Sequence, residues 1–398
     1  MTEAPLAGIT VISLEQAVAA PYATRQLADL GARVVKIERP QGGDFARGYD
    51  RSVHGESSYF VWLNRGKESV TLDLKAPEGL RIVHRLLDDA DVLVQNLGPG
   101  ASARMGLDAV AVARSHPRVI TATISGYGED GPWKDRKAYD LLVQAEAGLL
   151  SVTGSAAEVA RTGVSIADIA AGMFTYSGIL TALYTRATTG VARPVSVSLF
   201  DALVEWMSQP LYYGRYGGAA PARTGARHPT IAPYGPFTAS DGGTVLLAVQ
   251  NPPEWQRLCE IVLDRADLVA DSRFATNPDR VAHRDELEVI IAAAVARFGT
   301  DELETRLDKA ALAHARMNDV EQLAGHPVLT GRNRWRGIQT PGGPAEALPP
   351  PAGLAGIEPV LGEVPALGAH SRKVLSELGY SKSAVDQLIA AGVTSSSS

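Results

Sequence analysis

The chain has 398 residues, more than one hydrophobic core usually serves, so two domains are expected. Hydrophobic residues make up 45% and charged residues 21%, as in a soluble globular protein. A net charge of −6 argues against a nucleic-acid-binding surface. Because Cys259 is the single cysteine, an internal disulfide is excluded, which fits a reducing compartment.

The ends and the apolar stretches predict a cytoplasmic protein with no membrane contact. Residues 1–16 lack a basic region followed by an apolar core, so no signal peptide is expected. The run from Ile169 to Thr185 is uncharged, yet it holds three Thr and two Tyr and is short for a membrane span. Its Ala and Gly content predicts a buried helix that its neighbours approach closely.

Strand and helix patterns alternate through the first half of the chain. A strand at 9–14, a helix ending near Gly31 and a strand at 33–38 form a βαβ unit, which predicts a parallel sheet. Further strands are expected at 69–73, 91–95, 119–125 and 195–199, and helices at 78–87, 107–115, 139–150, after Asp168, and from the last strand to about Leu211. This alternation is typical of an α/β, Rossmann-like doubly wound sheet, whose ligands bind beyond the carboxyl ends of the strands.

The second half predicts a smaller α+β domain. Asp241-Gly242-Gly243 between apolar runs indicates a hairpin, and helical patterns follow at 254–262, 284–298 and 301–312. A Pro/Gly-rich connection at 341–365, two helices at 369–378 and 381–391, and a disordered tail at 394–398 are expected. The predicted division is a large domain at 1–213, a linker with an active-site loop at 214–236, a small domain at 237–335, and a return to the large domain at 336–398.

Several kinds of chemistry are excluded by spacing. The G-x-G-x-x-G turn is absent, so no NAD site is expected although Glu38 stands at the usual ribose position. No two histidines stand three to five residues apart, which excludes a metal site of that kind. Gly66-Lys67-Glu68-Ser69 lacks the features of a P-loop, so no ATP site is expected, and no G-x-S-x-G elbow is present.

The remaining candidates for functional residues are carboxylates and cations in loops. Asp168 stands at the start of the uncharged helix, where backbone N–H groups favour a negative charge, and a plain helix cap is the alternative to a reactive role. Four cations follow predicted strands, and together they could grip a ligand with several phosphates, or each could be a solvated surface charge: Arg39, Lys75, Arg104 and Lys137.

Motifs over the first 200 residues carry a specific resemblance. They include AAPYATRQLADLGARVVKIERPQGGD, LNRGKESVTLDLKAPEG, VQNLGPGASARMGL, ISGYGEDGPW, KAYDLLVQAEAGLLSVTG, VSIADIAAGM and PVSVSLFDAL. The chain resembles the family III coenzyme A transferases, which include formyl-CoA transferase, carnitine CoA-transferase and α-methylacyl-CoA racemase. The resemblance implies that family's fold, an interlocked homodimer, and CoA or acyl-CoA as substrate.

The resemblance also implies a mechanism. Asp168 would attack the thioester of an acyl-CoA donor, for which succinyl-CoA is a candidate, giving an aspartyl anhydride and then an aspartyl-CoA thioester. A free carboxylic acid, with a dicarboxylate as a candidate, would then take the CoA. The family's CoA contacts fall on Arg39, Leu72, Lys75, Asn96, Leu97, Arg104 and Lys137.

Two positions depart from the family pattern. Formyl-CoA transferase has a Gln one place after the position of Ala17, where this chain has Val18, with Gln16 two residues earlier. The racemase histidine falls at Tyr139, and a phenol with an ordinary pKa near 10 disfavours proton abstraction compared with an imidazole near about 6.5. This favours transfer over the alternatives, an acyl-CoA racemase or isomerase and a non-catalytic acyl-CoA-binding protein.

The loop Thr224-Gly225-Ala226-Arg227-His228-Pro229 lies where these transferases place a mobile Gly-rich lid. Arg227 and His228 are candidates to hold the second carboxylate of an acceptor acid, and a solvated linker arginine is the alternative. Gln16, Ala17 and Tyr139 are the other candidate substrate contacts.

Overall fold

The computed structural model describes residues 4–396, which fall into two compact units. Unit 1 is built from Met1–Ala147, Thr162–Ser208 and Thr330–Ser398, and unit 2 from Gly148–Arg161 and Gln209–Leu329. Residues 148–161, 209–213 and 330–335 thus lie on the other side of the predicted borders. Segment 148–161 belongs to unit 2 because it binds the predicted linker: Arg223 Nε donates to the carbonyl of Ser155 (2.9 Å) and Gly225 N to that of Gly154 (2.8 Å).

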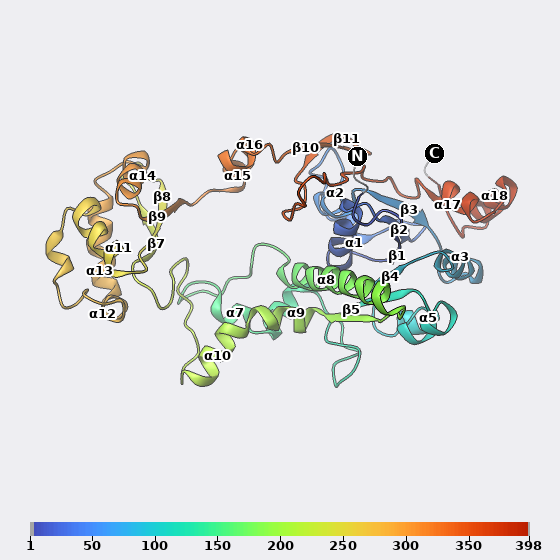
Figure 1. The fold of residues 1–398 in the computed structure, drawn as a ribbon, viewed down its shortest axis with the longest axis horizontal. Helices are drawn as coiled ribbons and strands as arrows, with labels where there is room; N and C mark the ends of the chain where they lie inside the picture. Colours follow the sequence, from blue (N-terminus) through green and yellow to red (C-terminus); the bar gives the residue numbers. More distant parts are fainter. Residues whose placement is uncertain (1–3, 397–398) are drawn as a thin grey trace. The chain divides into compact units, whose positions relative to one another are not determined.

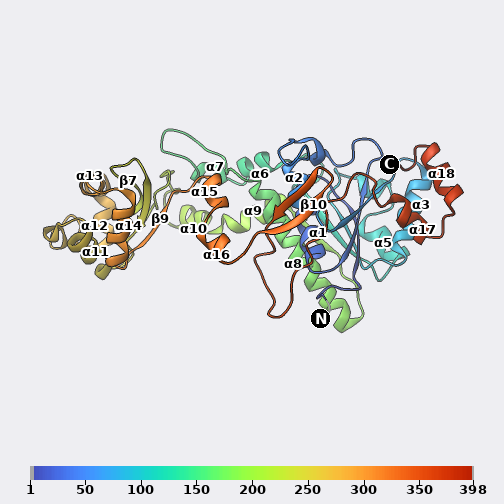
Figure 2. The ribbon, with the colours of Figure 1, turned by 90° about the horizontal axis from the view of Figure 1, so that it is seen from above.

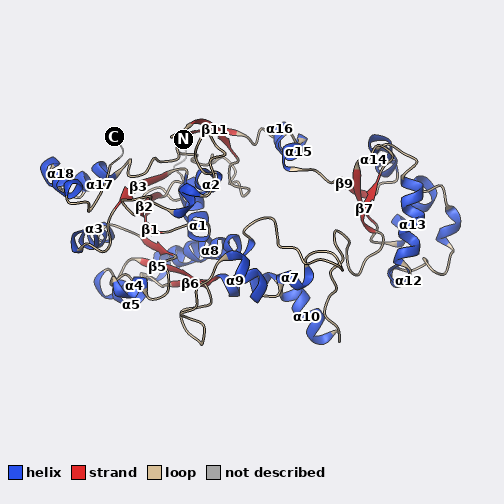
Figure 3. Cartoon of the chain, turned by 180° about the vertical axis from the view of Figure 1, so that it is seen from behind, coloured by secondary structure: helices blue, strands red, loops and turns tan. Residues whose placement is uncertain are grey.

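Unit 1 contains a six-stranded parallel sheet in the order β3-β2-β1-β4-β5-β6 (Figure 3). Ile12 in the middle of β1 lies opposite Val35 on one side and Leu93 on the other. The order reverses between β1 and β4, and this switch point is where doubly wound sheets bind ligands. The expected α/β fold with a parallel sheet is confirmed. The strands are β1 (Thr10–Leu14), β2 (Arg33–Glu38), β3 (Lys67–Thr71), β4 (Val92–Gln95), β5 (Ile120–Ser125) and β6 (Val195–Ser198).

Helices cover both faces of this sheet (Figures 1 and 2). On one face, α1 (Ala19–Asp29) packs along α8 (Ile166–Thr189), which also contacts α6 (Asp140–Glu146) and α9 (Leu199–Trp206). On the other face, apolar side chains of the sheet form one core with α3, α5, α17 and α18. These four helices are α3 (Pro77–Leu87), α5 (Ala109–Ser115), α17 (Ser371–Glu377) and α18 (Lys382–Ala390).

The contact between α1 and α8 is close because a glycine stands in it. A Cβ on Gly172 would lie 2.6 Å from the carbonyl oxygen of Ala19. The close approach predicted from the Ala and Gly content is therefore confirmed. By length and composition alone α8 could also cross a membrane. Within unit 1 its residues Ala170, Ala171 and Gly172 are buried.

The C-terminal segment is more ordered than predicted. Thr394 is buried and its hydroxyl donates to the carbonyl oxygen of Thr71 (2.6 Å), while Ser395 N donates to the Thr71 hydroxyl (2.7 Å). Unpaired backbone and hydroxyl groups at the end of β3 supply these partners, which a Ser-rich composition does not reveal. The expectation of a disordered tail is wrong for residues 394–396, and residues 397–398 lie outside the described residues.

Unit 2 contains an antiparallel sheet of β7 (Tyr234–Thr238), β8 (Thr244–Ala248) and β9 (Ala313–Arg316), with the predicted hairpin at Asp241-Gly242-Gly243. Its core lies between this sheet and helices around Trp255, Phe274 and Ile291. These helices are α11 (Pro252–Arg257), α12 (Asn277–Ala282), α13 (Arg284–Val295) and α14 (Thr300–Lys309).

The predicted connection at 341–365 contains a strand that the sequence reading missed. In unit 1, β10 (Arg336–Thr340) and β11 (Gly343–Ala347) form an antiparallel hairpin. The short α-helices not yet named are α2 (Ser58–Asn64), α4 (Ala101–Arg104), α7 (Leu149–Val152), α10 (Ser208–Tyr216), α15 (Val320–Ala324) and α16 (Pro327–Gly331). Further short helical turns are η1 (Phe45–Gly48), η2 (Leu258–Val262) and η3 (Ala266–Val269).

Candidate active site

A cavity of about 890 Å³ opens at the carboxyl ends of β1, β2 and β3 and the loop after β4. Three cations line it, Arg39, Lys75 and Arg104. Its volume lies in the range of cavities that hold small-molecule ligands, which runs from about 300 to 1,000 Å³. Its larger apolar side chains are Leu14, Ile37, Leu72, Leu74, Leu80, Leu97 and Met105, and its acidic lining residues are Glu15, Glu38, Asp44 and Asp73. The cavity therefore offers separate surfaces to an anionic group and to a flat apolar ring.

The loops after β1 and β4 are fastened to each other at the switch point. The Asn96 side chain accepts a hydrogen bond from Gln16 N (2.9 Å) and donates one to the Gln16 carbonyl (2.8 Å). One amide side chain thus satisfies both backbone groups of Gln16, a residue that lines the cavity.

The next residue in this loop takes a rare backbone conformation. Ala17 has a φ of 61°, and its N–H donates to Asp44 Oδ1 (2.9 Å). A left-handed conformation disfavours residues other than glycine, so a fixed partner is needed to hold it. Asp44 also accepts from Ala46 N (2.9 Å) and binds Lys36 Nζ (2.6 Å).

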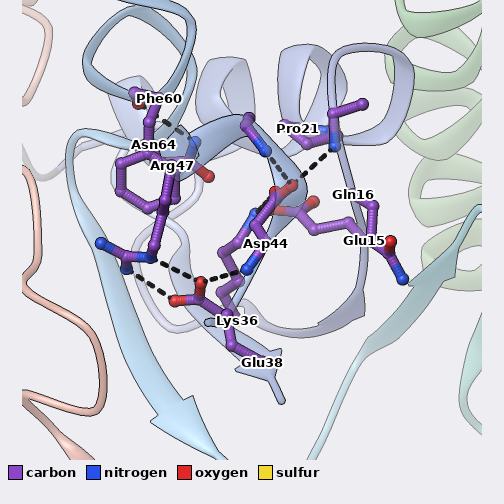
Figure 4. Close-up of polar contacts among 12 residues, drawn as sticks. Glu15, Gln16, Pro21, Lys36, Glu38, Asp44, Arg47, Phe60 and Asn64 are labelled. Carbon is purple, nitrogen blue, oxygen red and sulfur yellow. Dashed lines mark hydrogen bonds and ion pairs between the residues drawn. The ribbon is translucent and has the colours of Figure 1, made fainter. Parts of the chain in front are cut away.

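Charged side chains are buried directly beneath this loop (Figure 4). Lys67 Nζ donates to Glu15 Oε1 (2.6 Å), to the Pro21 carbonyl (3.1 Å) and to Asn64 Oδ1 (3.1 Å). Lys36 lies between Asp44 and Glu15, 3.4 Å from Glu15 Oε1. Burial lowers the pKa of Lys67 to about 7 although Glu15 opposes this. Burial would raise the pKa of Glu15, but Lys67 and Lys36 lower it below its usual value.

A second buried pair continues the network. Arg47 grips Glu38 with two hydrogen bonds of 2.8 Å. Burial alone would raise the pKa of Glu38, and the hydrogen bonds and charge of Arg47, together with Lys36, lower it to about 2. The three carboxylates of this cluster are thus matched by three cations. Of the remaining charged residues that line the cavity, three are cations and one, Asp73, is acidic.

Arg39 in that wall is held in place from two sides. Its Nε and Nη2 donate to the carbonyl of Gly43 (3.1 and 2.7 Å), and its guanidinium lies 4.3 Å from the ring centre of Phe45. Gly43 has a φ of 62°, and a Cβ there would lie 2.7 Å from Glu38 Oε2. Only glycine fits this turn, which is why the loop after β2 reads Gly42-Gly43-Asp44.

Asp168 occupies the first turn of α8, where it is half-buried. Asp140 at the start of α6 caps this helix, because its Oδ1 accepts the N–H groups of Ala167 (2.8 Å) and Asp168 (3.2 Å). Among residues 4–396 no protein group donates a hydrogen bond to the carboxylate of Asp168. Burial, and then the charge of Asp140, raise the pKa of Asp168 to about 7. Asp168 is therefore not the helix cap.

Comparison with known proteins assigns the chain to a family. A family model described as CoA-transferase family III matches residues 6–371. The chain belongs to CoA-transferase family III. It is 34% identical to a succinate–glutarate CoA-transferase of Agrobacterium fabrum, over 94% of this chain and 96% of that one. It is 35% identical to an acetyl-CoA:oxalate CoA-transferase of Acetobacter aceti, over 86% and 89%.

A solved structure agrees with this assignment. A CaiB/BaiF family protein from Brucella suis superposes with a TM-score of 0.84 at 31% identity, over 95% of this chain and 100% of that one. The chain is thus a transferase enzyme of family III, whose substrates are CoA thioesters and carboxylic acids.

The structure brings most of the predicted CoA contacts of this family III enzyme to one cavity. Asn96 instead fastens the loop below the cavity. Lys137 is exposed in the segment after β5 and is not part of the lining, and Tyr139 is exposed directly before α6. The predicted residues that do line the cavity are Gln16, Arg39, Leu72, Lys75, Leu97 and Arg104.

The predicted acceptor residues lie in unit 2. Arg227 Nε binds Glu288 Oε2 (2.7 Å). His228 stacks on Tyr234 with ring centres 5.3 Å apart. Both side chains are therefore engaged within their own unit.

Sequence reasoning missed the residues that hold the site together. Asp140 and Asp44 act through backbone N–H groups far along the chain, and no local pattern points to those partners. A signal for Glu15, Lys36 and Lys67 was present, since each is a charged residue within or beside an apolar strand pattern. A charge in such a place is buried with a partner.

We predict that the buried cluster is strongly coupled. Lys67→Met should leave Glu15 without its nearest cation and lower the free energy of unfolding by about 3 kcal/mol. Glu15→Gln should lower the free energy of unfolding by a similar amount. The double variant should lower it by clearly less than the sum of the two single variants. Urea titration measures all three. Strict additivity would contradict the coupling, and Arg265→Gln, at an exposed ion pair in unit 2, is the control expected to change little.

We also predict that Asp168 lowers stability at neutral pH. Because its folded-state pKa lies above its unfolded value, its ionisation as pH rises from about 4 to about 7 disfavours the folded state. Asp168→Asn should unfold like the parent below pH 4 and be more stable at pH 8, by about 1–2 kcal/mol after allowance for its partial exposure. Urea titrations at the two pH values test this, with exposed Asp135→Asn as control. An equal gain in the free energy of unfolding at both pH values would contradict this prediction.

Proposed function

We propose that Asp168 is the nucleophile that carries CoA from an acyl-CoA donor to a free carboxylic acid. The observation that supports this most is a carboxylate at the start of α8 that no protein hydrogen bond engages, with its pKa raised to about 7. A more basic carboxylate is a better nucleophile, and at pH 7 a large fraction of it is ionised. Asp140 holds the helix end, so Asp168 is free for chemistry.

The proposed reaction needs no external energy source. A carboxylate oxygen of Asp168 attacks the thioester carbonyl of the donor, the C–S bond breaks, and CoA leaves as a thiolate. The thiolate attacks the aspartyl carbonyl of the anhydride, which releases the donor acid and leaves an aspartyl-CoA thioester. The acceptor carboxylate attacks this thioester and expels the thiolate, which then attacks the acyl carbonyl of the new anhydride and frees Asp168.

We assign the cavity of unit 1 to CoA. Arg39, Lys75 and Arg104 would pair with the phosphate groups, since guanidinium and ammonium groups bind phosphate oxygens strongly. The leucines of the lining would cover the adenine ring. Lys137 is proposed to reach a phosphate from outside this wall, in keeping with the family's contacts.

We propose succinyl-CoA as donor and a dicarboxylate as acceptor. The relatives named above carry glutarate and oxalate in their names, and others are named for mesaconate and D-citramalate. These acids share two carboxylates, and Arg227 and His228 are the proposed group that binds the second one. Tyr139 at the position of the racemase histidine favours transfer over racemisation.

We further propose that the enzyme is a cytoplasmic homodimer. Large apolar side chains are exposed on this chain, among them Tyr184 on α8 and Tyr212 and Tyr216 on α10. A soluble monomer rarely leaves so much apolar surface uncovered. Light scattering on the purified protein should give twice the mass of the chain.

The central test is covalent trapping on Asp168. With succinyl-CoA and each of glutarate, oxalate and mesaconate, the parent should form the new acyl-CoA, and rapid quenching with peptide mass spectrometry should find the CoA adduct on Asp168. Asp168→Asn should lose at least about a thousandfold in rate and give no adduct. Exposed Asp135→Asn should match the parent. Transfer retained by Asp168→Asn, or solvent deuterium at the α-carbon without any transfer product, would contradict the proposal.

We predict that Arg227 acts on the acceptor alone. Arg227→Ala should raise the acceptor KM by about tenfold, because a charge-assisted hydrogen bond is lost, and change the donor KM less than twofold. Glu288→Gln is the matched control, since it removes the ion pair and keeps the arginine. Parallel increases in both KM values for Arg227→Ala would contradict this role.

A further inference from the structure

A second cavity, of about 270 Å³, lies in unit 1 where the C-terminal end of α1 meets the segments on either side of the β10–β11 hairpin. It shares no lining residue with the cavity assigned to CoA. Its walls include Leu30 of the α1 end, and Pro349, Pro350, Leu354 and Ile357 of the segment after β11. This segment is anchored, because Val360 N donates to the carbonyl of Asp29 (2.8 Å).

Three arginines converge on this small space: Arg332, Arg334 and Arg336. Arg334 Nη2 donates to the carbonyls of Pro349 (2.8 Å) and Pro350 (3.0 Å), so its guanidinium is held at the wall. Arg336 Nη1 donates to backbone carbonyls of Asn333 and Trp335. Within residues 4–396 none of the three arginines forms an ion pair with a carboxylate.

The acidic residues beside the arginines do not balance them. Asp29 lines the cavity, but its carboxylate is taken by Arg65, through Nε (2.9 Å) and Nη2 (2.8 Å), and by Arg25 (2.7 Å). Glu358 is the other acidic lining residue, and it is exposed. Arg25 and Arg65 thus occupy the carboxylate of Asp29. The three arginines that line the cavity are left with Glu358 as the one other acidic lining residue. Like charges gathered in one cavity repel each other unless an anion lies between them.

We propose that this cavity binds a compact anion with two or three negative charges, whose oxygens belong to carboxylate or phosphate groups. Guanidinium groups present paired N–H donors that match such oxygens, and Arg334 is already oriented by its carbonyl partners. A volume of about 270 Å³ admits a small polyanion, such as a tricarboxylate or a phosphate with its water shell, and is too small for a CoA molecule. The site is independent of the CoA chemistry at Asp168.

Titration calorimetry on the full-length protein with saturating CoA tests this, because CoA then occupies the other cationic cavity. Citrate and inorganic phosphate are the two probes, and the tighter one shows whether carboxylate or phosphate oxygens are preferred. Binding should weaken as salt is raised. Arg332→Gln should weaken it about tenfold, and Arg332→Gln/Arg336→Gln about a hundredfold. The exposed Arg114→Gln removes the same charge elsewhere and should leave binding unchanged.

Each outcome decides the proposal. Saturable binding of either probe that weakens in the Arg332 variant and persists in Arg114→Gln and in Arg39→Gln supports it. Lack of saturable binding by both probes, or binding that the Arg332 and double variants retain, overturns it. Because Arg336 also donates to backbone carbonyls, thermal unfolding without ligand must show that the double variant is folded. If the double variant is unfolded, the single variant Arg332→Gln, at an exposed residue, tests the proposal alone.

Discussion

The site depends on a set of charges buried beneath it. Lys36 and Lys67 lie within β2 and at the start of β3, and both side chains are fully enclosed. Removing such ions from water costs several kcal/mol each, and the cost is offset only where opposite charges and hydrogen bonds surround them. Glu15 and Asp44 supply these partners, and both come from loops at the carboxyl edge of the sheet. The cations therefore determine where these two loops lie.

This constraint extends to the loops that line the cavity through backbone contacts. Asp44 holds the strained Ala17 while it neutralises Lys36, so the buried charge and the loop conformation are linked. The strand order is that of dinucleotide-binding sheets, yet the glycine-rich turn that presents backbone amides to phosphate is missing. In the binding mode proposed above, side chains at strand ends take the phosphate-binding role, above all Arg39, whose guanidinium is already fixed by Gly43 and Phe45.

Much of this could be predicted from the sequence, because it rests on local patterns. The alternation of β-branched runs and helices predicted the parallel sheet, and the position of cations after strands predicted the three cations of the cavity, Arg39, Lys75 and Arg104. The hairpin at β10 and β11 was missed because proline and glycine outweigh its short apolar pattern. The ordered end around Thr394 and the cap by Asp140 rest on partners hundreds or tens of residues away, which periodicity does not show. The contact of Arg227 with Glu288, 61 residues further along, is another long-range partner that periodicity does not show.

The glycine between α1 and α8 bears on how two successive acyl transfers can share one carboxylate. Because Gly172 lies against the backbone at Ala19, α8 cannot slide or tilt without a steric clash with α1. The proposed nucleophile, carried on such a rigid support, stays where it is from one half-reaction to the next. In the proposed reaction the sulfur and the two acids then exchange places around a stationary carboxyl carbon.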